Sequence, residues 1–317
     1  LNALPQFRTA IDGLHTHFLH VRSPHADALP LVMTHGWPGS VVEFLKVIGP
    51  LTDPTRHGGK AEDAFHVVCP SLPGYGFSDK PREPGWDATR IGRTWGKLMQ
   101  RLGYTSWVAQ GGDWGAMVTT SIAQTETGHC RGVHVNMPIV APDMDTMNEL
   151  TELEQSALAG MHHYGEWDSG YSKQQSTRPQ TLGYGLADSP AGQAAWILEK
   201  FWAWTDCGDG HHRHPERVLG RDELLDNVMV YWLSNSAASS ARLYWESFRT
   251  PNMDPVTIPA GASIFPKEIF RASRRWAEKR FQQLVYWNEL ERGGHFAAFE
   301  QPELFVGELR ACFRAMR

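Results

Sequence analysis

Gly111-Gly112-Asp113-Trp114-Gly115 is the stretch that decides the fold of this 317-residue chain. It has the small-x-nucleophile-x-small pattern of a tight turn between a strand and a helix. The small residues at 111 and 115 let the two backbones pass closely. Residues 104–110 before the turn are typical of a short buried strand, and residues 116–124 after it are typical of a packed helix. The sequence therefore predicts a strand–turn–helix unit that pushes the side chain of Asp113 outward.

An aspartate at the centre of this turn restricts the chemistry. A carboxylate is ionised near pH 7 and can attack without first losing a proton. It is a weak nucleophile, which suits an sp3 carbon with a strained or stable leaving group, in an epoxide or a carbon–halogen bond. The product would be an aspartyl ester that water must hydrolyse. An ordinary turn aspartate in a glycine-rich loop is the alternative interpretation.

Composition excludes several classes of protein. An apolar content of 41% is enough for a large core, and a net charge of −5 gives no basic excess for nucleic acid. The arginines of residues 271–275 and the pair Lys279-Arg280 are expected on a solvated helix face. No apolar run is long enough for a membrane span and no signal peptide opens the chain, so a cytoplasmic protein with four reduced cysteines is expected. His211-His212-Arg213-His214 lacks partnered ligands, so neither a metal nor a cofactor is expected.

The order of the expected elements predicts a mostly parallel sheet flanked by helices. Strand-like and helix-like segments alternate up to Pro138. The strand-like ones are residues 11–21, 29–34, 64–69, 105–110 and 132–135, and the helix-like ones are 40–51 and 88–102. The alternation then stops and resumes with strands at 262–265 and 283–287 and helices at 270–280 and 302–316. In between, helices are expected at 144–164, 190–204, 221–235 and 239–248. We therefore expect a core of residues 24–140 and 251–317 that is interrupted by a helical cap of residues 141–250.

A histidine and an acid follow the last two expected strands. His295, in Gly293-Gly294-His295-Phe296, would lie at the carboxyl edge of the sheet, where Asp113 also points. It could serve as the general base for the water that hydrolyses the ester, and such a base needs an orienting carboxylate. Glu268 follows the strand at 262–265 and is one candidate, although on its own it is expected to be an exposed structural residue. Asp254, before that strand, is the competing acid.

Two further groups would complete such a site. His35-Gly36-Trp37-Pro38-Gly39 follows an early strand, and the backbone N–H groups of Trp37 and Trp114 are expected to bind the oxyanion that forms on Asp113 when water attacks. Opening an epoxide leaves an alkoxide that needs a proton donor, which a cap tyrosine could supply. Sequence position does not rank the candidates, which are Tyr164, Tyr171, Tyr184, Tyr231 and Tyr244.

Several stretches together resemble one known family. They include THGWPGS at 34–40, PSLPGYGFSDKP at 70–81, QGGDWGA at 110–116, FPKE at 265–268 and RGGHFAAFEQPE at 292–303. Over nearly its whole length, the chain resembles the microsomal-type epoxide hydrolases of the α/β-hydrolase superfamily, a group that includes the juvenile hormone epoxide hydrolases. The resemblance implies an α/β-hydrolase fold with an inserted cap. It also implies that Asp113 is the nucleophile, His295 the base and Glu268 its acid partner.

The resemblance also ranks the tyrosines and describes the N-terminus. Residues 168–179 and 239–246 match the two cap tyrosine segments of the family, which implies that Tyr171 and Tyr244 bind the epoxide oxygen and protonate the alkoxide. Residues 1–23 match the end of an N-terminal wrapping segment and the first strand. The membrane anchor of the animal enzymes has no counterpart, which favours a soluble bacterial-type relative.

The sequence therefore predicts a cofactor-independent epoxide hydrolase that makes a vicinal diol through an aspartyl ester. Trp37, Trp114, Tyr171 and Tyr244 would contact the substrate. Thirteen tryptophans favour an aromatic or lipophilic epoxide, in detoxification or secondary metabolism. A haloalkane dehalogenase with the same nucleophile is the main alternative, and a hydrolase fold used only for binding is another. A homodimer is a further hypothesis, and no nucleic acid partner is expected.

Overall fold

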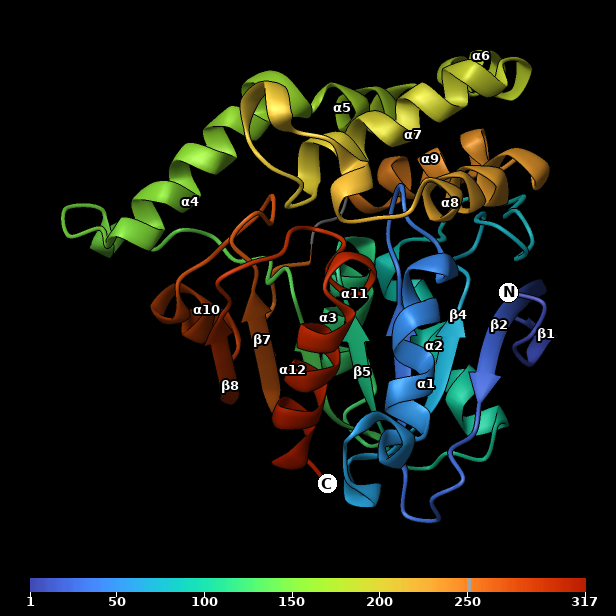
Figure 1. Ribbon diagram of the computed structural model, residues 1–317, viewed down its shortest axis with the longest axis vertical. Coiled ribbons are helices and arrows are strands. Elements are labelled where there is room, and N and C mark those ends of the chain that lie inside the picture. The colour runs from blue at the N-terminus through green and yellow to red at the C-terminus, as the bar shows by residue number, and fades with distance from the viewer. Residues whose placement is uncertain (250–251) are drawn as a thin grey trace.

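The centre of the molecule is an eight-stranded sheet with the strand order β1-β2-β4-β3-β5-β6-β7-β8 (Figure 1). The computed structural model describes residues 1–249 and 252–317. The strands from β3 to β8 pair in parallel, and the two antiparallel pairs are β1 with β2 and β2 with β4. The predicted mostly parallel sheet is therefore confirmed. The strands are β1 Gln6–Ile11, β2 Leu14–Val21, β3 Leu29–Thr34, β4 Phe65–Pro70, β5 Trp107–Gly111, β6 Cys130–Val135, β7 Ala260–Ile264 and β8 Leu284–Glu289.

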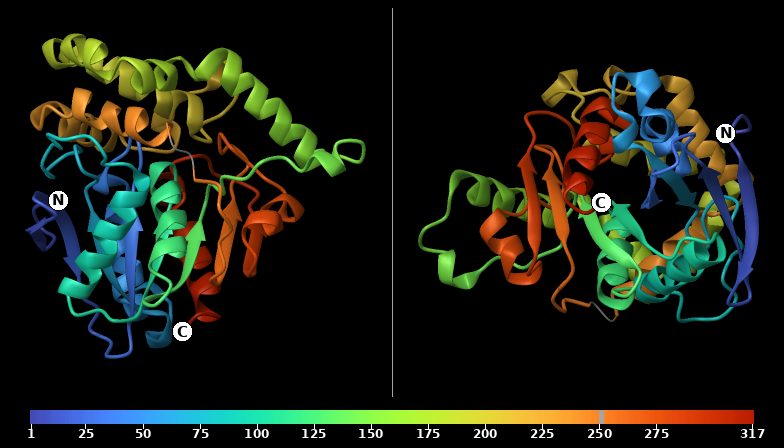
Figure 2. Two further views of the ribbon diagram at one scale, coloured as in Figure 1. Left: turned by 180° about the vertical axis from the view of Figure 1, so that it is seen from behind. Right: turned by 90° about the horizontal axis from the view of Figure 1, so that it is seen from below.

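Helices cover both faces of this sheet. Helices α1 and α12 lie on one face and α2 and α3 on the other (Figure 2). Alternate residues of β3 supply the two cores, since Leu31 and Met33 pack with α1 and α12 whereas Val32 packs with α2 and α3. The core helices are α1 Leu45–Thr52, α2 Ala88–Arg101, α3 Trp114–Thr125, α10 Arg274–Arg280, α11 Ala297–Glu300 and α12 Pro302–Arg314.

The N-terminal strand differs from its prediction. Residues 11–21 were expected to form one strand, but β1 and β2 form a hairpin in which Ile11 pairs with Leu14. The turn residues Asp12 and Gly13 both have positive φ, 50° and 82°. An Asp-Gly pair between two strands is the strongest local hairpin signal, because both turn positions need that conformation. The strand prediction missed this signal, so it merged the turn and the end of β1 into one element.

A layer of helices covers the edge of the sheet at which the parallel strands end (Figure 1). Its elements are α4 Glu152–His163, the π-helical turn Tyr164–Asp168, α5 Gly170–Thr177, α6 Pro179–Asp188, α7 Pro190–Trp204, α8 Arg221–Leu233 and α9 Ala237–Ser247. The expected helices at 190–204, 221–235 and 239–248 are confirmed to within two residues. Helices α5 and α6 were not predicted, because residues 170–188 are glycine-containing and polar and carry little apolar periodicity. The predicted cap boundary between residues 250 and 251 lies outside the described residues.

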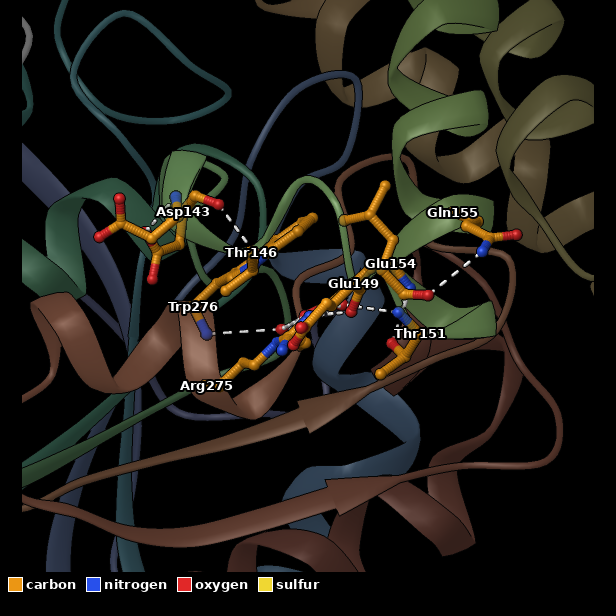
Figure 3. A network of polar contacts seen from close by, with 11 residues as sticks. Asp143, Thr146, Glu149, Thr151, Glu154, Gln155, Arg275 and Trp276 are labelled. Carbon is orange, nitrogen blue, oxygen red and sulfur yellow. Dashed lines mark hydrogen bonds and ion pairs between the residues drawn. The ribbon is translucent and has the colours of Figure 1, made fainter.

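The base of α4 is attached to the core by an ion pair whose carboxylate is buried (Figure 3). The expected helix at 144–164 begins only at Glu152, where Thr151 and Glu154 form a capping box. The carboxylate of Glu154 is fully buried and accepts hydrogen bonds from Arg275 at 2.6 Å and from Ser273 at 2.6 Å. Arg275, expected on a solvated face, keeps 39% of its side chain exposed while it pairs with this buried carboxylate. Arg280, expected on the same face, is only 7% exposed and donates to the carbonyl of Ile139, so the prediction was wrong for that residue. The contact between Glu154 and Arg275 joins the first cap helix to the residues that begin α10.

Candidate active site

The turn between β5 and α3 has the strained geometry that the glycine pattern predicts. Asp113 lies at φ 51° and ψ −128°, outside the regions that non-glycine residues favour. A Cβ atom at Gly111 would overlap the carbonyl of Gly115, and one at Gly115 would overlap the carbonyl of Thr34. Only glycine fits at these two positions, and the close packing holds Asp113 between the strand and the helix.

The carboxylate of Asp113 lies on the turn that follows β3. Its Oδ1 atom accepts a hydrogen bond from the backbone N–H of Trp37 at 2.8 Å. A Cβ atom at Gly36 would overlap this carboxylate, so the turn needs glycine there. Trp114 is the first residue of α3, and its N–H stays a predicted second donor. The predicted contact between Asp113 and the 35–39 turn is therefore present through Trp37.

His295 lies between two carboxylates. Its Nδ1 is 2.6 Å from Oε1 of Glu268, and its Nε2 is 3.4 Å from Oδ2 of Asp113. Burial alone would lower the pKa of His295, but the two carboxylates outweigh it and hold the pKa well above its usual value of 6.5. The backbone N–H of His295 donates to the carbonyl of Trp204 at the end of α7, so a cap residue also fixes the loop that carries the histidine.

Glu268 is buried, contrary to the expectation of an exposed residue. It is 4% exposed, and its Oε1 also accepts the N–H of Ile269 at 2.7 Å. The bridge between Lys267 and Gly294 holds the Glu268 loop beside the His295 loop. Asp254, the competing acid, lies elsewhere, where the side-chain amide of Gln124 donates to its backbone carbonyl at 2.7 Å. The structure therefore brings Glu268, and not Asp254, to the histidine.

The two cap tyrosines pack against the tryptophans of the site. The ring of Tyr171, on α5, stacks on Trp37 at a centroid distance of 4.7 Å. The ring of Tyr244, on α9, meets Trp114 edge to face at 4.7 Å. Both side chains are buried, and burial raises the pKa of each phenol well above its usual value of 10. Both hydroxyls therefore carry their protons at neutral pH.

A third cap tyrosine, Tyr164, lies beside the hydroxyl of Tyr171. The hydroxyl of Tyr164 lies 3.0 Å from that of Tyr171. Tyr164 opens the π-helical turn between α4 and α5, a distortion that is frequent at functional sites. Of the other candidates, Tyr184 is 70% exposed, and the Tyr231 hydroxyl donates to the carbonyl of Gly39 at 2.6 Å.

An apolar cavity of about 350 Å³ opens beside Asp113. Trp114, Tyr171 and Tyr244 line it together with side chains that sequence reasoning did not select. The latter come from α3, from the segment after β6, from the cap and from the segment after Glu268: Met117, Met137, Ile139, Met161, Phe248 and Phe270. No local motif marks these residues, because they meet only when the cap lies on the sheet. The cavity has the size and apolar character of a small-molecule site.

The fold and this site define a hydrolase of the α/β-hydrolase class with an aspartate at the nucleophile position. Residues 30–179 match the family described as alpha/beta hydrolase fold, and residues 1–44 match the epoxide hydrolase N terminus. A relative from Stigmatella aurantiaca, whose name also assigns it to the epoxide hydrolases, is 58% identical over the whole chain and 71% of its own length. The chain belongs to the epoxide hydrolase family.

Two further relatives agree with this assignment. Epoxide hydrolase 1 of Oryctolagus cuniculus is 40% identical over 98% of this chain and 74% of its own length. The structure of Aspergillus niger epoxide hydrolase superposes with a TM-score of 0.88 at 33% identity, covering the whole of this chain and 80% of that one. The predicted α/β-hydrolase fold and epoxide hydrolase activity are confirmed. In the described parts of the chain, no helix is long and apolar enough to cross a membrane.

Proposed function

We propose that Asp113, His295 and Glu268 convert an epoxide to a vicinal diol in two steps through a covalent ester on Asp113. The observation that carries this proposal is the unbroken series of contacts from Glu268 to His295 to Asp113, beside a cavity lined by two protonated tyrosines. The class of substrate, a small-molecule epoxide, follows from membership of the family. The roles of the individual residues are our assignment.

In the first step, one oxygen of Asp113 attacks an epoxide carbon. The bond between that carbon and the epoxide oxygen breaks, and the oxygen takes a proton from Tyr171 or Tyr244. A phenol is a suitable donor, because an alkoxide is far more basic than a phenolate. Hydrogen bonds from both hydroxyls would stabilise the negative charge as it develops. Trp37 and Trp114 would hold the two tyrosine rings in place. Trp114, which lines the large cavity, would contact the substrate, whereas Trp37, also expected to do so, lines only a smaller cavity on the other side of Asp113.

In the second step, His295 takes a proton from water, and the water oxygen attacks the ester carbonyl of Asp113. The N–H of Trp37, with that of Trp114 as the expected partner, would bind the oxyanion. Alkylation converts Asp113 from a carboxylate to a neutral ester, which removes one of the two negative charges that raise the pKa of His295. The pKa of His295 therefore falls when the ester forms, which favours the neutral imidazole that can accept a proton from water. The charge of Glu268 remains and stabilises the imidazolium that results.

The haloalkane dehalogenase alternative gains no support from the relatives. A halide leaves without a proton, so buried, protonated tyrosine hydroxyls beside the nucleophile would have no task in that reaction. Tyr171→Phe and Tyr244→Phe separate the two chemistries. A large loss of activity in both variants supports epoxide opening, and halide release by a protein whose variants keep their activity supports dehalogenation.

The remaining features of the assignment are also proposals. The apolar lining of the large cavity favours a lipophilic or aromatic epoxide, and a panel of aryl and alkyl epoxides with chiral analysis of the diols tests this. We assign residues 141–250 as the cap, 24–140 and 251–317 as the core, and 1–23 as the end of a wrapping segment with the first strands. A cytoplasmic location, a homodimer and a role in detoxification or secondary metabolism stay predictions from the sequence.

A single turnover in heavy-oxygen water tests the covalent route. Because the ester oxygen comes from Asp113, the first diol formed should carry unlabelled oxygen, and the label should enter the protein at Asp113. Full label in the first diol would contradict the covalent route. Asp113→Ala should abolish turnover without changing the unfolding temperature by more than a few degrees, and His295→Ala should trap the ester for mass spectrometry.

A further inference from the structure

Asp113 lines two different cavities. The large cavity, of about 350 Å³, is lined by the cap tyrosines. A small cavity of about 20 Å³ is lined by His295 and by the turn of residues 34–37. Within the described residues, Asp113 is the single side chain common to both linings. A substrate in the large cavity and a water in the small one would therefore reach the same carboxyl group from separate places.

The small cavity has the size and polarity of a site for one water molecule. A water needs roughly 10–15 Å³ of such space and two to four polar partners. Thr34 and Gln110 line this cavity, and Oγ1 of Thr34 and Oε1 of Gln110 are buried without a hydrogen-bond partner. A buried polar atom without a hydrogen bond destabilises the folded protein, and a water molecule in the cavity would supply the missing bond. His295, which the second step requires as base, lines the cavity beside them.

Glu43 is a buried acid in the same lining that the mechanism above does not use. It lies in the 3-10 turn Val41–Phe44 and is 9% exposed. A Cβ atom at Gly39 would overlap Oε1 of Glu43, so the carboxyl group lies directly on the backbone of the 35–39 turn. Burial raises the pKa of Glu43 to about 8, with His295 opposing and Asp113 adding to the shift. A neutral carboxyl group can both donate and accept a hydrogen bond, and it does not repel the carboxylate of Asp113.

We propose that Glu43 and His295 together hold the hydrolytic water in the small cavity, with Glu43 orienting its oxygen toward the ester carbonyl of Asp113. This inference rests on the proposed function and assigns Glu43 to its second step alone. The water donates one hydrogen to Nε2 of His295 and the other to an oxygen of Glu43, which leaves a lone pair free for attack.

The bonds of this step balance without a further reactant. The water oxygen bonds to the ester carbonyl carbon of Asp113 as His295 takes the first proton. When the tetrahedral intermediate collapses, the bond from that carbon to the ester oxygen, which came from Asp113, breaks, and this leaving oxygen takes the proton from His295. The second proton of the water leaves Asp113 as the carboxylate is restored, and it returns to the tyrosine that lost one. Glu43 begins and ends the step in the same protonation state.

The experiment measures the two steps separately in the 317-residue chain. Styrene oxide is mixed with an excess of enzyme and quenched at intervals, and mass spectrometry follows the ester on Asp113 as it forms and decays. Glu43→Leu should slow the decay of the ester by about tenfold or more, as expected for the loss of one hydrogen bond, and should leave its formation within about twofold. Glu43→Gln, which keeps an acceptor and a donor, should stay within about threefold of the parent in both steps.

Two controls separate the possible failures. Glu308→Gln alters another buried acid, held by Ser263 and Tyr286 away from both cavities, and should leave the ratio of the two rates unchanged. The inference about Glu43 is overturned if Glu43→Leu accumulates no more ester than the parent, or if it slows both steps equally as a folding defect would. The proposed function fails instead if His295→Ala, in the same assay, yields no ester on Asp113.

Discussion

Tyr244→Phe should make the protein more stable and less active. Tyr244 is 2% exposed, and its hydroxyl has no hydrogen-bond partner among the described residues. An unsatisfied buried polar group costs about 1–3 kcal/mol, because it loses its hydrogen bonds to water and gains none. Removing the hydroxyl should therefore raise the free energy of unfolding by about 1 kcal/mol, which corresponds to roughly 2 °C in Tm for a chain of this size.

The same substitution should slow the first chemical step. A hydrogen bond to a charged oxygen contributes about 1.5–3 kcal/mol, so its loss from the developing alkoxide corresponds to a decrease of about ten- to hundredfold in the rate of ester formation. The attack of water on the ester does not need the hydroxyl of Tyr244, because a tyrosine takes back its proton only after the ester is cleaved, so the rate of ester decay should change little. Rapid-quench measurements give the rate of ester formation, and thermal and urea unfolding of the same preparation give the change in stability.

Tyr231→Phe is the matched control, because it removes the same atom from another buried cap tyrosine. The hydroxyl of Tyr231 donates to the carbonyl of Gly39 at 2.6 Å, so its removal should lower the free energy of unfolding by about 1–3 kcal/mol. The two variants should therefore shift Tm in opposite directions. If Tyr244→Phe destabilises the protein as much as Tyr231→Phe, the hydroxyl of Tyr244 is satisfied in the folded protein and the reasoning is refuted.

Three other predictions concern the triad and the base of the cap. Glu268→Gln should slow ester decay by about a hundredfold or more while ester formation continues, so the ester should accumulate in a quenched reaction. The decay rate of the ester on Asp113 should fall as the pH is lowered, because His295 must be neutral to accept a proton; a decay rate that rises on acidification would contradict its role as base. The pKa of Glu154 is lowered from 4.5 to about 2, chiefly by Arg275, so this pair contributes stability that is present above about pH 4.5 and lost as the pH falls toward 2. Glu154→Gln should reduce that part of the acid sensitivity in urea unfolding measured between pH 5 and pH 2, and an unchanged slope would contradict it.

The elements of the sheet could be predicted because their signals are local. Asp113 and its flanking glycines identify a strand–turn–helix unit without any knowledge of the rest of the chain. The parallel strands follow from short apolar runs that alternate with helical patterns. The hairpin at Asp12 was missed although its signal is just as local, and the start of α4 was missed although Thr151 and Glu154 form a recognisable capping box.

The walls of the site could not be predicted, because they depend on contacts between distant segments. Glu268 looked exposed in isolation, and it is buried only because the loop of His295 lies beside it. Arg275 looked solvated, and it pairs with Glu154 more than a hundred residues earlier in the chain. Tyr164 could not be ranked among the cap tyrosines, since its position depends on a π-helical turn that no sequence pattern indicated.

The presence of two cavities at one carboxyl group has a consequence for how such an enzyme can change. The side chains that would decide which epoxide fits belong to the large cavity, and several of them come from the cap. Those that would govern water attack belong to the turn after β3 and to the His295 loop, within the core. Substitutions can therefore accumulate around the substrate and alter its range or handedness while the machinery that regenerates the catalyst is inherited unchanged.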